Sequence, residues 1–93
     1  MRPPFGSRNA AVESTLASLG YVITMWSLDS GDSLGQTFAQ QQDNFNSAPN
    51  SGNAANVLMH DVQSLTAQSL VAWVINWVQL RGLRCAQPMC ARF

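Results

Sequence analysis

His60 is the residue of this sequence that is best suited to acid–base chemistry. It is the only histidine among 93 residues, and it directly follows the short apolar run at 57–59. Imidazole changes its charge near neutral pH, and a side chain at the C-terminal end of a buried strand is well placed to meet a ligand. For the residue taken alone, the more ordinary interpretation is a structural histidine that satisfies a loop carbonyl.

Two acidic residues, Asp29 and Asp32, follow another strand-like segment. This segment, at 21–26, is β-branched and aromatic, which is typical of a strand buried on both faces. If the two strands are parallel neighbours, their C-terminal ends lie about 5 Å apart. We therefore expect a carboxylate of Asp29 or Asp32 to lie within hydrogen-bonding reach of His60, with Arg2 opening onto the same cleft.

The elements that must position these residues alternate along the chain. Apolar spacing and turn residues predict helices at about 10–19, 35–47 and 64–81, strands at about 21–26 and 55–60, and the stub of a third strand at 83–86. Strands about 30 residues apart with a helix between them are typical of right-handed βαβ units and a parallel sheet. The predicted fold class is therefore α/β, and a βα barrel would bring the candidate residues to one rim.

Composition limits the partners of the chain. Five basic and five acidic residues leave no net charge, so there is no basic patch for the phosphates of a nucleic acid. No apolar run reaches the length of a membrane span, and we expect no signal peptide within the chain. Charged residues make up 11% and hydrophobic residues 46%, which indicates surfaces that further protein covers. Cys85 and Cys90 alone do not make a zinc site, and their disulfide status stays open.

Three short motifs carry a resemblance to a known family. RPPFG at 2–6, WSLDSGD at 26–32 and VLMHD at 57–61 resemble, in order and separation, the third, fourth and fifth motifs of the NodB-type polysaccharide deacetylases. This family, carbohydrate esterase family 4, includes the fungal chitin deacetylases, and residues 64–85 also resemble the last barrel helix of its fungal members. The resemblance implies a partial NodB homology domain over 1–87, followed by a divergent tail over 88–93.

The family resemblance implies the C-terminal portion of a distorted (β/α) barrel and a function. The full-length enzymes remove N-acetyl groups from chitin-like polymers of N-acetylglucosamine, use zinc or cobalt, and are secreted or lie in the cell wall. His60 would be the general acid that protonates the leaving amine. Asp32, before Asp29, would orient the imidazole of that acid, so we predict a hydrogen bond between an Asp32 carboxylate oxygen and a His60 ring nitrogen.

The same resemblance gives roles to three further residues. Arg2 would hold the aspartate that acts as catalytic base, and Leu58 would line the pocket for the acetyl methyl group. Phe5 would give its backbone N–H to the oxyanion, a role that uses the main chain only. Two positions depart from the family pattern, since Ser33 stands where a tryptophan is usual and Asn56 where an aliphatic residue is usual.

The first two motifs of the family are not in this sequence. They are Thr-Phe-Asp-Asp-Gly, which supplies the base and one metal ligand, and His-x-x-x-His, which supplies the other two ligands. One histidine cannot make a site of two histidines and one aspartate. We therefore expect the C-terminal half of a deacetylase that binds no metal, is inactive alone and, with its first strand unpaired, tends to associate.

Two other interpretations stay open. A carbohydrate-binding or protein-interaction module could use Trp26, Trp73 and Trp77, although their spacing favours a place in the core. A complete small α/β enzyme could use Asp32 and His60, but the sequence has no serine or cysteine nucleophile in an elbow motif. Whether the chain is an enzyme by itself is therefore not decided by the sequence.

Overall fold

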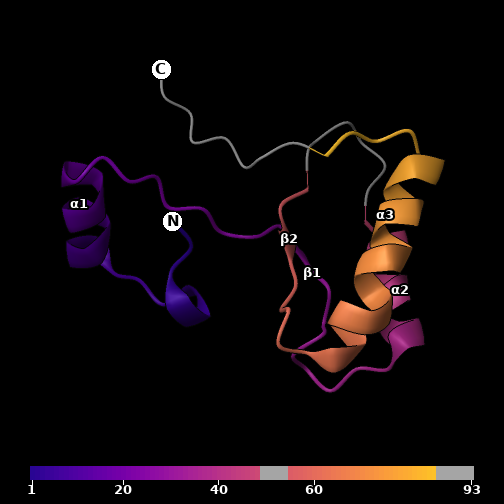
Figure 1. Ribbon diagram of the computed structural model, residues 1–93. Helices are drawn as coiled ribbons and strands as arrows, with labels where there is room; N and C mark the ends of the chain where they lie inside the picture. The colour runs from indigo at the N-terminus through magenta and orange to yellow at the C-terminus, as the bar shows by residue number, and fades with distance from the viewer. Residues whose placement is uncertain (49–54, 86–93) are drawn as a thin grey trace. The chain divides into compact units, whose positions relative to one another are not determined.

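The computed structural model describes residues 1–48 and 55–85, shown in colour in Figure 1. The chain divides into two units, of which one comprises Met1–Met25 and the other Trp26–Cys85 among the described residues. The predicted tail at 88–93 and Cys90 lie outside the described residues.

The first unit contains a 3-10 turn, η1 (Pro4–Gly6), and one helix, α1 (Ala10–Ser18). The side chain of Asn9 caps the helix by accepting a hydrogen bond from the Val12 amide at 2.9 Å, which satisfies an N–H that has no partner within the helix. Gly20, with φ of 80°, ends the helix in the left-handed conformation that glycine adopts without strain. The predicted helix at 10–19 is therefore confirmed to within one residue.

The predicted strand at 21–26 is wrong. These residues have no strand pairing, although the Thr24 amide donates to the Met1 carbonyl at 2.8 Å. Tyr21 and Val22 are 55% and 43% exposed, so the segment lacks the burial that its composition indicates. A β-branched sequence favours a strand only where a neighbouring strand pairs with it and covers its faces.

The second unit is built on two short parallel strands, β1 (Leu28–Asp29) and β2 (Val57–Leu58). Leu28 pairs with Val57 and Asp29 pairs with Leu58. The predicted parallel order is confirmed, but the first strand begins after the predicted range of 21–26, and the second is shorter than the predicted range of 55–60. No strand forms at 83–85, so the predicted stub is wrong there, and residue 86 lies outside the described residues.

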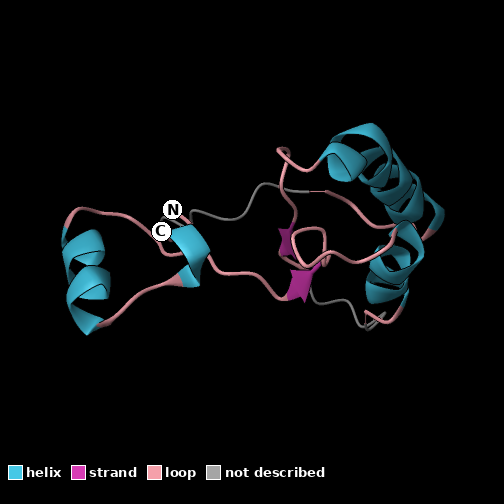
Figure 2. Ribbon diagram, turned by 90° about the horizontal axis from the view of Figure 1, so that it is seen from below, coloured by secondary structure: helices cyan, strands magenta, loops and turns pink. Residues whose placement is uncertain are grey.

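Two helical runs lie on the same side of the strands, as Figure 1 and Figure 2 show. The first, α2 (Phe38–Asn46), begins at a capping box in which the Thr37 hydroxyl accepts from the Gln40 amide and the Gln40 side chain accepts from the Thr37 amide. The second begins with a π-helical turn, η2 (Thr66–Leu70), and continues as α3 (Val71–Leu80). The helices predicted at 35–47 and 64–81 are confirmed, apart from the π turn and a later start of α2.

The core of this unit forms where the two helical runs meet. Phe45 of α2 and Leu70 of η2 are fully buried. The Phe45 ring packs edge to face against Trp73 at 5.8 Å and Trp77 at 5.6 Å between ring centroids, a geometry that aromatic pairs prefer. Among the described residues, no helix is long and apolar enough to cross a membrane.

Replacing Leu70 by alanine should destabilise the second unit strongly. The change leaves a cavity in the core and should lower the free energy of unfolding by about 2–5 kcal/mol. Leu80→Ala is the matched control, because Leu80 lies in the same helical run but is 79% exposed, and it should change stability by less than about 0.5 kcal/mol. Urea unfolding followed by circular dichroism measures both, and equal effects would contradict the assigned core.

Candidate active site

The candidate site begins in the tight loop that follows β1. The Asp29 carboxylate accepts a hydrogen bond from the Gly31 amide at 2.9 Å, and the Ser30 hydroxyl accepts from the Asp32 amide at 3.3 Å. Such bonds to the backbone two residues on are typical of Asx and Ser turns. Gly31 has φ of 77°, and a Cβ at this position would lie 2.0 Å from Gln36 Oε1. The loop therefore needs glycine here in order to turn Asp32 toward β2.

The Asp32 carboxylate is buried and receives hydrogen bonds from two other segments. Its Oδ2 accepts from the His60 backbone N–H at 2.6 Å and from the Thr66 hydroxyl at 2.7 Å. Its Oδ1 lies 2.8 Å from His60 Nδ1, while the Asp32 side chain is 1% exposed. An ionised carboxylate only accepts, so His60 carries a proton on Nδ1. The predicted contact between Asp32 and His60 is thus confirmed.

These hydrogen bonds control the ionisation of Asp32. Burial by itself raises the pKa of this carboxyl, because a charge is costly away from water. The hydrogen bonds from the His60 ring, the His60 backbone and the Thr66 hydroxyl outweigh burial, so the pKa of Asp32 lies below its usual value. Asp32 is therefore a fixed negative charge at neutral pH.

The side chain of His60 is partly exposed. The His60 side chain is 38% exposed, while its Nδ1 is turned to Asp32. Nε2 is therefore the ring nitrogen that can meet a bound molecule. A carboxylate that orients an imidazole through Nδ1 and stabilises its protonated form is the arrangement used in general acid–base catalysis.

The other predicted site residues take different places. The Asp29 carboxylate holds Gly31 and lines an open pocket of about 320 Å³ together with Asn44, while Leu58 is half-buried in β2. Arg2 and Phe5 belong to the first unit, so their predicted place in the cleft of Asp32 stays a prediction.

Thr66 is the site residue that the sequence did not reveal. It lies in the first turn of an apolar helical run and is 1% exposed, with its hydroxyl on Asp32. A threonine at the start of a helix is common, and nothing in the sequence indicates which acceptor its hydroxyl meets. Only the spacing of six residues after His60 places it near the end of β2.

The described residues do not fit a resident metal centre. Among them, no three side chains of histidine, cysteine, aspartate or glutamate gather at a point where they could hold an ion. The sequence also has a single histidine, which is engaged with Asp32 through Nδ1. A site of two histidines and one aspartate therefore cannot be assembled from this chain alone.

The tryptophans of α3 serve the core. Trp73 and Trp77 are half-buried against Phe45, and the Trp77 indole N–H donates to Asn46 Oδ1 at 2.9 Å. The Arg81 guanidinium lies 4.3 Å from the centroid of the Trp77 ring, within cation–π distance. These contacts favour a packing role for both rings over an open sugar-binding platform.

Two curated proteins and one solved structure are similar to this chain, whereas no family model matches it. A chitin deacetylase of Pestalotiopsis sp is 37% identical over 89 residues, which cover 89% of this chain and 28% of that protein. A bifunctional xylanase/xylan deacetylase of Cellvibrio japonicus is 29% identical over 82 residues, which cover 88% of this chain and 12% of that protein. The chain thus spans less than a third of the length of these relatives.

The similar structure is that of the chitin deacetylase from the fungal pathogen Colletotrichum lindemuthianum. It matches with a TM-score of 0.78 and 29% sequence identity. The match covers 92% of this chain and 41% of the other. The arrangement of helices and parallel strands is therefore shared with that protein.

Asp32 should make the stability of the chain sensitive to acid. Because its pKa is lowered by folding, the unfolded chain takes up a proton first as the pH falls below about 4, and the stabilisation is lost progressively from there. Asp32→Asn should lower stability at pH 7 and flatten this acid dependence.

Urea midpoints between pH 2.5 and pH 7 measure the effect. Asp43→Asn serves as control, since Asp43 is an exposed carboxylate of α2, and it should retain the acid dependence of the parent chain. If the Asp32→Asn variant keeps the acid dependence of the parent chain, the hydrogen bonds to the Asp32 carboxylate contribute nothing to the stability of the fold.

Proposed function

Because this chain is homologous to the NodB-type polysaccharide deacetylases over part of their length, we propose that it is the part of such an enzyme that carries the general acid. The observation that supports this function best is the hydrogen bond of 2.8 Å between Asp32 Oδ1 and His60 Nδ1 at the C-terminal end of the parallel strands. The substrate is a polymer of N-acetylated sugars of the chitin type.

The chemical step assigned to His60 is the protonation of a leaving amine. Hydrolysis of an N-acetyl group passes through a tetrahedral intermediate, and the amine leaves only when it receives a proton. Protonated His60 gives this proton from Nε2, since Nδ1 is bound to Asp32. Asp32 does not take up the proton itself but holds the ring and stabilises its charged form.

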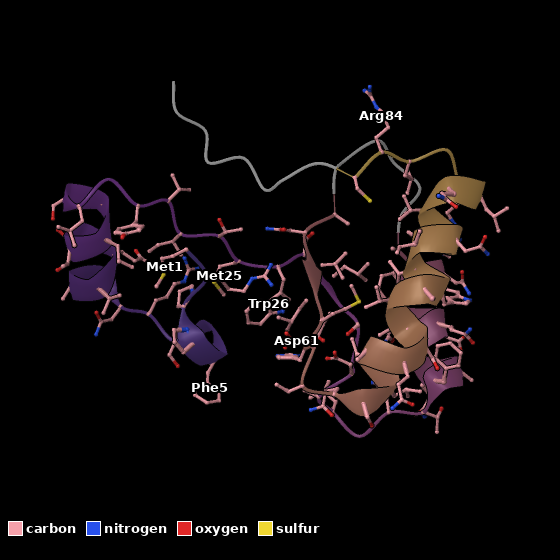
Figure 3. All side chains as sticks on the ribbon, in the orientation of Figure 1. Met1, Phe5, Met25, Trp26, Asp61 and Arg84 are labelled. Atoms are coloured by element: carbon pink, nitrogen blue, oxygen red, sulfur yellow. The ribbon has the colours of Figure 1, made fainter. Side chains whose placement is uncertain are left out.

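The first unit supports a contribution from the main chain. Phe5 has φ of 56°, an uncommon conformation for a residue of this size, and Phe5 is 99% exposed, with its side chain projecting from η1 (Figure 3). A ring without packing contacts leaves the backbone N–H as the part of Phe5 suited to bind an oxyanion. Arg2, by the same proposal, holds the catalytic base of the full-length enzyme.

The remaining roles complete the proposal. Leu58 borders the acetyl methyl group and Asp29 supports the substrate-binding loop. The base and the divalent metal are supplied by a part of the enzyme that this chain does not contain, so the chain alone releases no acetate. The full-length enzyme acts outside the cell or in the cell wall.

A chimeric enzyme tests the role of His60. The segment of the Pestalotiopsis sp chitin deacetylase that aligns with this chain is replaced by the chain itself, and acetate release from chitin oligomers is measured. The chimera should be active, and His60→Ala should lower kcat by about 10²- to 10⁴-fold, which is the usual contribution of a general acid. Asp43→Asn, a change of an exposed carboxylate of α2 that lies outside the three motifs, should have little effect.

The chimera can also contradict the role of His60. If the His60→Ala chimera melts like its parent and keeps its activity within a few-fold, His60 is not the general acid.

A further inference from the structure

The hydroxyl of Thr66 is a buried hydrogen-bond donor to Asp32. Thr66 lies outside the three sequence motifs that resemble the deacetylase family. From this contact we infer that Thr66 is a positioning residue, which fixes the Asp32 carboxylate so that Oδ1 faces His60 Nδ1. Thr66 Oγ1 donates to Asp32 Oδ2 at 2.7 Å across 34 positions of sequence. That Thr66 orients the Asp32 carboxylate follows from the geometry alone. Its importance for catalysis rests on the proposed function of His60 as general acid.

Thr66 reaches Asp32 because it begins a π-helical turn. In η2 (Thr66–Leu70) the Val71 amide donates to the Thr66 carbonyl, one residue further along than in an α-helix. The extra residue rotates the following helix by about 100° relative to Thr66. Thr66 can therefore face Asp32 while Trp73 of α3 packs on Phe45. Single π-helical turns of this kind are frequent at functional sites.

The two donors to Oδ2 restrict the carboxylate. The His60 amide and the Thr66 hydroxyl both bind Oδ2, so rotation of the carboxylate would break both bonds. Threonine suits this role because its branched side chain has few rotamers. With Oδ2 held, Oδ1 is left in line with the His60 ring. The Thr66 hydrogen bond also contributes to keeping the pKa of Asp32 low against the opposing effect of burial.

The tautomer of His60 shows whether Thr66 positions the Asp32 carboxylate, without any measurement of activity. The ring nitrogen that carries the proton in neutral imidazole is set by the partner of the other nitrogen. While Asp32 is held, neutral His60 is protonated on Nδ1, which leaves Nε2 for the substrate. When Thr66 no longer holds Asp32, the ring should lose this preference and populate the form protonated on Nε2.

Nitrogen-15 NMR of the isolated chain tests the inference. His60 is the only histidine, so its ring signals are assigned without ambiguity. At alkaline pH the parent chain should show the form protonated on Nδ1. Thr66→Val, which keeps the shape but removes the hydroxyl, should give at least a twofold drop in the population of that form. Thr66→Ser should restore it, and Ser64→Ala, which removes an exposed hydroxyl two residues before Thr66, should leave it unchanged.

The outcomes separate this inference from the proposed function. A folded Thr66→Val variant with the tautomer of the parent chain, or a folded Thr66→Ser variant that fails to restore it, overturns the role of Thr66. If the valine variant does not fold, the parent chain decides, because the Thr66 hydroxyl proton should exchange slowly with water and rapid exchange would overturn the inference. The chimera tests His60 independently, so either result can fail alone.

Discussion

The burial of the Asp32 carboxylate is the constraint on which the second unit depends. Removing a carboxylate from water costs several kcal/mol unless hydrogen-bond donors replace the lost solvent. Here the donors come from residues 28 and 34 positions further along the chain, His60 and Thr66. The loop after β1, the end of β2 and the start of η2 must therefore come together for the charge to be stable. The bonds that stabilise the fold are the same bonds that orient the imidazole.

The core between the two helical runs supports this site. Phe45, fully buried, holds the rings of Trp73 and Trp77 and so fixes α3 against α2. The π-helical turn joins this packing to the site, since Leu70 at its end is buried in the core and Thr66 at its start binds Asp32. A change in the aromatic cluster can therefore reach His60 through the helix and Thr66.

The contact between Asp32 and His60 was predictable from sequence. The hydrogen bond from Thr66 that supports this contact was not. Parallel strands bring their C-terminal ends together, so their order predicted that Asp29 or Asp32 would lie near His60, and the resemblance to the deacetylases selected Asp32. The strand predicted at 21–26 failed because pairing depends on a neighbouring strand and not on composition alone. Thr66 and its π turn could not be predicted, because burial of one hydroxyl depends on contacts between distant segments.

The hydrogen bond from the His60 amide to Asp32 Oδ2 can be detected directly by NMR, as scalar coupling through the bond between the amide nitrogen and the carboxylate carbon. A bond of 2.6 Å predicts a measurable coupling and an amide proton that is protected from exchange at pH 7. An amide that exchanges with water at the rate of an unfolded chain, with no coupling to Asp32, would contradict the site on which the proposed function and the role of Thr66 depend.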